Sequence, residues 1–167
     1  MLIAVVGAIG SGKSFYLKTL SEEGHFTVST DEINRELMAN ADYIAGLAKL
    51  FPACIENGTL SKQKLKETIF SDPTARAKLE AYSHPKIMAR IASVVKGQDA
   101  YVEVTAPTKD ILKKFDYVIL VDAPIEVRRQ RVTARDGISA ELFDKINSAQ
   151  MCHVELKKYA NEIVYTA

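Results

Sequence analysis

Short apolar runs alternate with longer segments of mixed polarity along this chain. The runs are rich in β-branched residues and apolar throughout, which is typical of strands that are buried on both faces of a sheet. They occupy residues 2–6, 25–29, 101–106, 117–123 and 162–166. The segments between them carry helix-start residues and helical spacing of their apolar positions. Strands separated by helices predict the α/β class, with a parallel sheet of about five strands covered by helices.

Residues 32–97 form the longest interval between two predicted strands. This interval is too long for one crossover helix, and its pattern predicts helices over 41–56 and 61–70. A new helix start is predicted at His84–Pro85, because proline favours the first helical turn. We therefore expect a helical insert over about 32–97, within one domain that spans residues 1–167.

Three further helices are predicted outside this insert. One is expected from Lys13 to about Leu20, directly after the first strand. A second follows Pro124, and a third is capped by Ser139 and runs to about Tyr159.

The composition is ordinary for a soluble globular protein and narrows the class of partner. Of the 167 residues, 47% are hydrophobic and 26% charged, and the net charge is +1. Such a chain lacks the overall basic field that favours nucleic acid.

No apolar run approaches the roughly 20 residues of a spanning helix, and the first run is too short for a signal peptide. Cys54 and Cys152 are far apart in sequence, which favours two reduced thiols. We expect a cytoplasmic protein without nucleic-acid or membrane partners, and the oligomeric state stays open.

The segment after the first strand matches the P-loop pattern G-x-x-x-x-G-K-[ST] at Gly7, Gly12, Lys13 and Ser14. Its glycines permit a left-handed backbone, so that the loop can turn its N–H groups inward beside the start of a helix. Lys13 can reach the β- and γ-phosphates, and the Ser14 hydroxyl can bind Mg²⁺. The residues expected to hold ATP are Gly10, Ser11, Gly12, Lys13, Ser14 and Phe15.

A P-loop alone does not separate kinases from GTPases and ATPases. The chain contains no N-K-x-D, which a GTPase would use to bind its base. The run VILVD, ending at Asp122, superficially resembles the acidic strand of large ATPases. However, Pro124 and an arginine-rich helix follow it, which suggests a different use.

Asp31 directly follows the second predicted strand. In a parallel α/β sheet, ligands bind beyond the carboxyl ends of the strands, so this carboxylate is expected to face the phosphate site. It can orient an attacking hydroxyl or accept its proton. The local sequence supports equally well a second role, in which Thr30 and Asp31 cap the helix that follows. The two roles do not exclude each other.

The helix after Pro124 carries several arginines, of which Arg131 and Arg135 are four residues apart and share a face. Over about residues 124–140, this segment is expected to act as a lid helix. Its guanidinium pair would neutralise charge that develops during phosphoryl transfer. The alternative is a solvated basic face that is partly paired by Glu126.

Together these motifs resemble the dephospho-CoA kinases, from Met1 to about Thr166. GAIGSGKS is similar to that family's GGIGSGKS loop, and STDEINREL to its DADxIAR segment. The stretch NGTLSKQKLKETIFSDP resembles its middle motif, and RVTARD its R-x-x-x-R-D, with Gln150 on the glutamine that follows. The resemblance implies a P-loop kinase that uses ATP and Mg²⁺ to phosphorylate the ribose 3′-hydroxyl of dephospho-CoA, the last step of coenzyme A biosynthesis. It also implies that Asp31 is the catalytic carboxylate and that the insert binds this substrate.

The chain departs from the family pattern mainly on the acceptor side. Ser29 stands where many members have the first Asp of DAD, and Phe15 replaces a Thr. Asp110 is the candidate to replace the family's substrate-side Glu after the third strand. His84 falls on the family's H-P pair and is a candidate acceptor contact, or simply a polar residue before a Pro-started helix.

Three hypotheses follow from these patterns. The first is an ATP-dependent dephospho-CoA kinase with Lys13, Asp31, Arg131 and Arg135 as catalytic residues. The second is a related P-loop kinase that acts on a nucleoside or nucleotide. The third is a nucleotide-binding module without catalysis, which the altered acceptor motif would explain.

Overall fold

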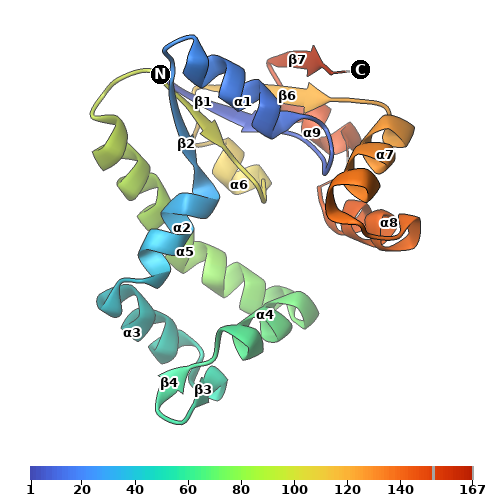
Figure 1. Ribbon diagram of the computed structural model, residues 1–167. Coiled ribbons are helices and arrows are strands. Elements are labelled where there is room, and N and C mark those ends of the chain that lie inside the picture. The colour runs from blue at the N-terminus through green and yellow to red at the C-terminus, as the bar shows by residue number, and fades with distance from the viewer. Residues whose placement is uncertain (152, 167) are drawn as a thin grey trace. The chain divides into compact units, whose positions relative to one another are not determined.

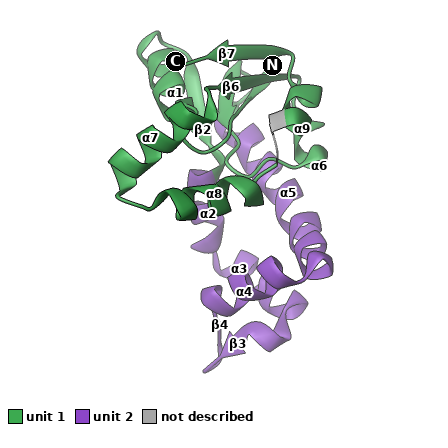
Figure 2. Cartoon of the chain, turned by 90° about the vertical axis from the view of Figure 1, so that its right-hand side faces the viewer, with its two compact units in different colours: residues 1–30, 95–167 green, residues 31–94 purple. Residues whose placement is uncertain are grey.

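The computed structural model describes residues 1–151 and 153–166. The chain divides into two compact units, which Figure 2 shows in different colours. Residues 1–30 and 95–167 form one of them, here called the sheet unit. Residues 31–94 form the other, here called the helical unit.

The sheet unit contains a five-stranded parallel sheet (Figure 1). Its strands in spatial order are β2 (Phe26–Ser29), β5 (Ala100–Glu103), β1 (Leu2–Val6), β6 (Tyr117–Asp122) and β7 (Glu162–Tyr165). The predicted α/β class with a parallel sheet of about five strands is therefore confirmed. The first strand in sequence lies at the centre, so the loop after Val6 leaves the middle of the sheet's carboxyl edge.

Helices cover both faces of this sheet (Figures 1 and 2). The helix α1 (Lys13–Glu22) packs on one face, where Leu17 and Leu20 join Val5 and Val121 in a buried cluster. The helices α6 (Lys109–Leu112) and α9 (His153–Tyr159) lie on the other face. The remaining helices of the unit are α7 (Ile125–Asp136) and α8 (Ala140–Ala149).

The helical unit is built around its own apolar core. Its elements are α2 (Thr30–Met38, which begins on the last residue of the sheet unit), α3 (Ala41–Leu50), the 3₁₀ turn η1 (Pro52–Cys54), the hairpin strands β3 (Ile55–Glu56) and β4 (Thr59–Leu60), α4 (Lys62–Ser71) and α5 (Pro73–Val95). Tyr43, Leu47, Phe51 and Leu65 form the centre of the core, together with the free thiol of Cys54. Cys152 lies outside the described residues.

Two predicted boundaries inside the helical unit are wrong. The helix expected over 41–56 ends at Leu50, because Pro52 starts a separate 3₁₀ turn. The new start expected at His84–Pro85 does not occur, since α5 continues through Pro85. Buried residues on both sides of the proline, Ser83 and Ile87 among them, hold the helix together across it.

The C-terminal third differs from expectation in one respect. The helix expected from Ser139 to about Tyr159 is divided into α8, which ends at Ala149, and α9. Its predicted start is confirmed, because the Ser139 side chain accepts a hydrogen bond from the Leu142 amide at 3.1 Å.

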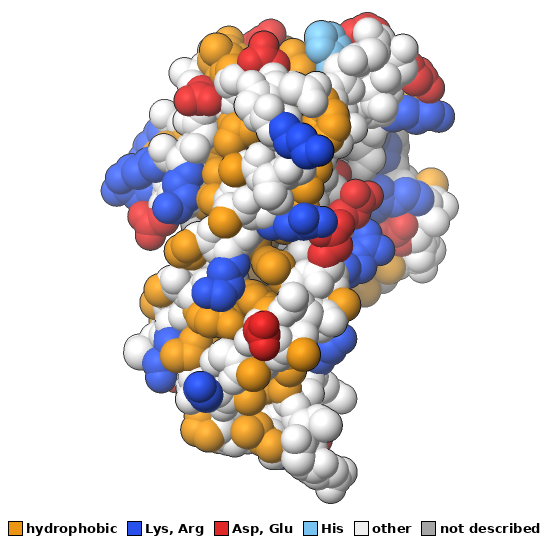
Figure 3. Space-filling model, turned by 90° about the vertical axis from the view of Figure 1, so that its left-hand side faces the viewer, with side chains coloured by type: hydrophobic (Ala, Val, Ile, Leu, Met, Phe, Trp, Pro, Cys, Tyr) orange, Lys and Arg blue, Asp and Glu red, His pale blue; other side chains and the backbone are white. Residues whose placement is uncertain are grey.

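No helix within residues 1–151 and 153–166 is long and apolar enough to cross a membrane. On the face that Figure 3 shows, acidic and basic side chains are interspersed with apolar ones.

Candidate functional site

The loop between β1 and α1 has the backbone conformation that phosphate binding requires. Gly10 and Gly12 have φ angles of 79° and 91°, in the left-handed region that favours glycine. Gly12 is the N-cap of α1, and no side chain in the described part of the chain caps this helix start. Amides at the start of a helix can bind an anion, and the helix dipole also favours negative charge there.

Glycine is required in this loop for space as well as for conformation. A Cβ at Gly10 would lie 2.6 Å from the Arg128 carbonyl oxygen. A Cβ at Gly7 would lie 2.6 Å from the carbonyl oxygen of Val121 and would also collide with the Ser11 hydroxyl. The loop thus approaches both β6 and α7 at backbone contact distance.

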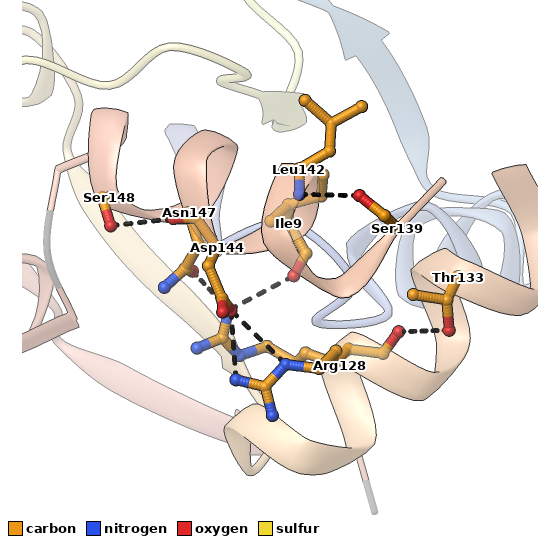
Figure 4. A network of polar contacts seen from close by, with 9 residues as sticks. Ile9, Arg128, Thr133, Ser139, Leu142, Asp144, Asn147 and Ser148 are labelled. Carbon is orange, nitrogen blue, oxygen red and sulfur yellow. Dashed lines mark hydrogen bonds and ion pairs between the residues drawn. The ribbon is translucent and has the colours of Figure 1, made fainter. Parts of the chain in front are cut away.

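Arg128 in α7 is hydrogen-bonded to the loop backbone at Ile9 (Figure 4). Its Nη1 donates to the Ile9 carbonyl oxygen at 3.3 Å and to Asn147 Oδ1 at 2.7 Å, and its Nε donates to the Ala123 carbonyl oxygen at 3.2 Å. Only 6% of Arg128 is exposed, and this burial lowers the pKa of its guanidinium. The Ile9 amide donates in turn to Gln150 Oε1 at 2.9 Å. Side chains from α7 and from the end of α8 therefore fix the same loop residue.

Arg131 reaches the other side of the loop, together with Thr166. The Arg131 guanidinium donates to the Gly10 carbonyl oxygen at 3.2 Å and to the Thr166 carbonyl oxygen at 2.9 Å. The Thr166 hydroxyl accepts a bond from Arg131 Nη1 at 3.0 Å and donates to the Ser11 carbonyl oxygen. The Thr166 amide donates to the Asp122 carbonyl oxygen at 2.9 Å. Thr166 thus links the loop, the end of β6 and α7.

The predicted nucleotide residues all lie in or beside this loop. Lys13 Nζ donates to the Gly7 carbonyl oxygen at 3.4 Å, so its ammonium lies over the loop. The side chains of Ser14 and Phe15 are exposed in the first turn of α1. The Ser11 hydroxyl is buried and has no hydrogen-bond partner within the described residues. A glycine cradle, open amides and an ammonium fit a polyphosphate, and an accessible hydroxyl fits a divalent cation beside it.

The other predicted residues are distributed over both units. Arg135 donates to both carboxylate oxygens of Asp136, at 2.7 and 2.8 Å, and this pairing lowers the pKa of Asp136. Asp110 is exposed in the first turn of α6. Asp31, in the first turn of α2, and the half-buried His84, in α5, belong to the helical unit.

Thr30, the residue before Asp31, is fixed to the sheet. Its hydroxyl donates to the Glu103 carbonyl oxygen at 3.0 Å and accepts from the Thr105 amide at 3.3 Å. The Thr30 side chain thus bonds to β5 and the residues after it. The chain therefore passes from a fixed point at the end of β2 directly into the turn that carries Asp31.

Three residues that hold the loop, Arg128, Gln150 and Thr166, were not among the predicted site residues. Arg128 and Val132 are both buried, four residues apart in α7. That spacing was a signal that Arg128 belongs to the inward face. Thr166 carried no signal of its own, because its partners lie far from it in sequence.

Among the residues that the structure describes, no group of three or more His, Cys, Asp or Glu side chains could hold a metal ion.

Comparison of the sequence with known proteins identifies the dephospho-CoA kinase family. Residues 1–166 match a family model described as dephospho-CoA kinase. The dephospho-CoA kinase of Deinococcus radiodurans is 28% identical over 97% of this chain and 82% of the relative. That of Corynebacterium jeikeium is 34% identical over 81% of this chain and 75% of the relative.

Solved structures share the fold of this chain. The crystal structure of TT1252 from Thermus thermophilus is 28% identical in sequence and has a TM-score of 0.85. The match covers 100% of this chain and 88% of the TT1252 chain. Dephospho-CoA kinase from Campylobacter jejuni, 23% identical over 99% of this chain and 88% of its own, has a TM-score of 0.66. Shikimate kinase from Acinetobacter baumannii, 18% identical over 99% of this chain and 83% of its own, has a TM-score of 0.56. The last two are similar in fold.

Proposed function

This chain belongs to the dephospho-CoA kinase family, and from that premise we propose that it transfers the γ-phosphoryl group of ATP to the ribose 3′-hydroxyl of dephospho-CoA. The observation that carries the proposal is the P-loop of the sheet unit, whose amides and glycines fit a polyphosphate, in a chain that matches this kinase family over residues 1–166. We also propose that the reaction is the last step of coenzyme A biosynthesis and that it takes place in the cytoplasm.

The loop residues are assigned to ATP. The amides from Gly10 to Phe15 hold the phosphates, and Lys13 turns from the Gly7 carbonyl toward the β- and γ-phosphates. The Ser14 hydroxyl is the proposed protein ligand of Mg²⁺, which supplies neutralisation of the phosphate charge when it is bound. Arg128 and Gln150 position the loop through the two backbone groups of Ile9.

Asp31 is the proposed catalytic carboxylate. It is exposed and is held in the first turn of α2 directly after the fixed residue Thr30. There it orients the 3′-hydroxyl for attack and takes up its proton as the bond to phosphorus forms. His84 and Asp110 are proposed to contact the acceptor.

Arg131 and Arg135 are proposed to neutralise the transferring phosphoryl group. Arg131 is already at the loop, with its guanidinium 3.2 Å from the Gly10 carbonyl oxygen. Arg135 is exposed one helical turn further on and pairs with Asp136, so it can exchange that carboxylate for a phosphate. These contacts favour α7 as the proposed lid helix.

A coupled assay of ADP release, with and without dephospho-CoA, tests the proposal. We expect ADP release to depend on dephospho-CoA, and phosphorus NMR of the product to show a new 3′-phosphomonoester. Equal release with adenosine or a nucleoside monophosphate would instead support a nucleoside or nucleotide kinase. ATP binding without transfer to any of these acceptors would support a module that only binds nucleotide.

A further inference from the structure

Asn147 in α8 has no part in the transfer proposed above, yet it contacts the residue that holds the P-loop. Its side-chain oxygen accepts a hydrogen bond of 2.7 Å from Arg128 Nη1, and the same nitrogen donates to the Ile9 carbonyl oxygen at 3.3 Å (Figure 4). Arg128 Nε donates to the carbonyl oxygen of Ala123, the residue after β6, at 3.2 Å. The guanidinium is therefore fixed between the loop, the end of β6 and α8.

The bond from Arg128 to Ile9 determines which way the next amide points. In a trans peptide, the C=O and the following N–H point to opposite sides of the chain. The Ile9 carbonyl points toward Arg128 in α7, so the Gly10 N–H points away from α7. Among the described residues the Gly10 amide has no hydrogen-bond acceptor, which suits it to a phosphate oxygen.

Arg128 also brings a buried positive charge to the loop. Its hydrogen bonds within residues 1–151 and 153–166 all go to neutral oxygen atoms. Burial lowers the pKa of this guanidinium, Asp122 raises it and Arg129 lowers it, and the pKa is lowered overall. Arginine nevertheless stays protonated in proteins. The charge therefore persists, although its surroundings do not fully compensate it.

This charge is close enough to the loop to act on a bound polyphosphate. A phosphate oxygen bonded to the Gly10 amide would lie within about 9 Å of the guanidinium, since only two hydrogen bonds and the width of one peptide group separate them. Charges interact more strongly across protein of low dielectric constant than across water. Arg128 can thus attract the phosphates without touching them.

The position of Asn147 is set by the packing of α8 against α7. Phe143, one turn before Asn147, is fully buried, and the centre of its ring lies 6.0 Å from Arg128 Cζ and 5.6 Å from Arg129 Cζ. The Arg129 guanidinium donates to Asp144 Oδ1 at 3.1 Å. The acceptor that Asn147 offers to Arg128 is therefore part of a packed interface between two helices.

We propose that Asn147 is a positioning residue for ATP, an inference that rests on the ATP-binding part of the proposed function. Its neutral oxygen holds the Arg128 guanidinium against the Ile9 carbonyl, so that the Gly10 amide faces the phosphates. Because the oxygen is neutral, it also leaves the charge of Arg128 uncompensated, and this charge attracts the phosphates. A carboxylate in the same place would hold the guanidinium equally well but would cancel its charge.

Asn147→Asp tests this role, because it keeps the acceptor oxygen and adds a negative charge. We expect calorimetry to show about five- to tenfold weaker ATP binding, with KM for dephospho-CoA within about twofold of wild type. Ser148→Asp is the matched control, since it adds the same charge one residue later at an exposed site, where water and salt screen it. Its affinity for ATP should stay within about twofold of wild type.

A double-mutant cycle tests whether Asn147 acts through Arg128. Arg128→Met removes the charge and the donors but keeps an unbranched apolar stem, and we expect at least about tenfold weaker ATP binding. Asn147→Ala should weaken ATP binding about threefold in the wild-type background and have no further effect in Arg128→Met. Equal effects in both backgrounds, with the fold intact by circular dichroism, overturn the proposal. If Arg128→Met does not fold, the comparison of Asn147→Asp with Ser148→Asp still decides.

The outcomes separate the two proposals. ATP binding by wild type, with equal affinity in Asn147→Asp, overturns this inference and leaves the proposed function standing. Transfer to an acceptor other than dephospho-CoA, with the expected loss of ATP affinity in Asn147→Asp, overturns the proposed function and supports this inference. Absence of ATP binding by a folded wild-type protein overturns both.

Discussion

In the proposed reaction Asp31 acts on the acceptor hydroxyl and the loop residues bind ATP. Single substitutions can therefore distinguish the effect on turnover from the effect on ATP binding. Asp31→Asn keeps the size and polarity of the side chain but removes its ability to take up a proton. We expect kcat to fall about 10²- to 10⁴-fold, while the affinity for ATP, measured by calorimetry, stays within about twofold. Asn34→Asp is a useful comparison, since it changes charge one turn away on the same helix. Normal turnover of Asp31→Asn would remove Asp31 from the mechanism.

Thr166 shows what a single residue outside the glycine pattern contributes to the loop. Its hydroxyl bonds both Arg131 and the Ser11 carbonyl oxygen, so Thr166→Val, which keeps the shape, leaves two polar groups without that partner. We expect KM for ATP to rise about five- to tenfold at nearly unchanged KM for dephospho-CoA. Thr133→Val is the control, because among the described residues that hydroxyl bonds within its own helix, to the Arg129 and Gln130 carbonyl oxygens. Equal effects of the two variants would show that the Thr166 contacts do not support the loop.

These residues also show how far the sequence predicts the site. The P-loop could be predicted because its four defining residues lie within eight positions and follow a recognisable strand. Arg128 and Thr166 could not be identified as loop supports, because their contacts join positions separated by 119 and 155 residues. Spacing within one helix or strand contains no information about such partners.

At the scale of elements, the sequence predicted the strands better than the helices of the insert. The strands of the parallel sheet are short runs rich in apolar residues, and each was expected within a few residues of its observed bounds. The hairpin β3–β4 was missed, although Asn57 and Gly58, with φ angles of 51° and 79°, form the two-residue turn that such a hairpin favours. Its strands have only two residues each, too few for an alternating pattern to be visible.

The continuous helix α5 leads to a prediction about Pro85. A proline inside a helix removes one backbone hydrogen bond and clashes with the preceding turn, which destabilises the helix by about 3 kcal/mol. Its rigidity lowers the entropy of the unfolded chain, which stabilises the folded protein by up to about 1 kcal/mol. Pro85 is exposed, so Pro85→Ala should raise the free energy of unfolding by about 1–2 kcal/mol. Urea denaturation followed by circular dichroism measures this. Ala89→Pro, at an exposed site one turn later, should lower stability instead, and a loss of stability in Pro85→Ala would mean that the proline is needed where it stands.

At the scale of the whole molecule, the proposed functions divide between the two units. The loop, its supporting residues and Arg131 belong to the sheet unit, whereas Asp31 and His84 belong to the helical unit. The chain passes from one unit to the other between Thr30 and Asp31, so the proposed catalytic carboxylate is the first residue of the helical unit. Nucleotide binding and acceptor binding should therefore respond to different substitutions, and transfer should respond to both.

Gly10→Ala tests this division from the nucleotide side. The substitution places a Cβ 2.6 Å from the Arg128 carbonyl oxygen and puts alanine at a φ of 79°, so the loop must shift away from α7. We expect calorimetry to show at least tenfold weaker ATP binding, with the affinity for dephospho-CoA in the absence of ATP unchanged. Gly24→Ala is the matched control, because Gly24 has a similar φ of 93° but a Cβ there meets no atom within 4 Å. This variant should lose some stability and bind ATP with unchanged affinity. Equal loss of both ligands in Gly10→Ala, with the fold intact by circular dichroism, would show that the two units do not bind their substrates separately.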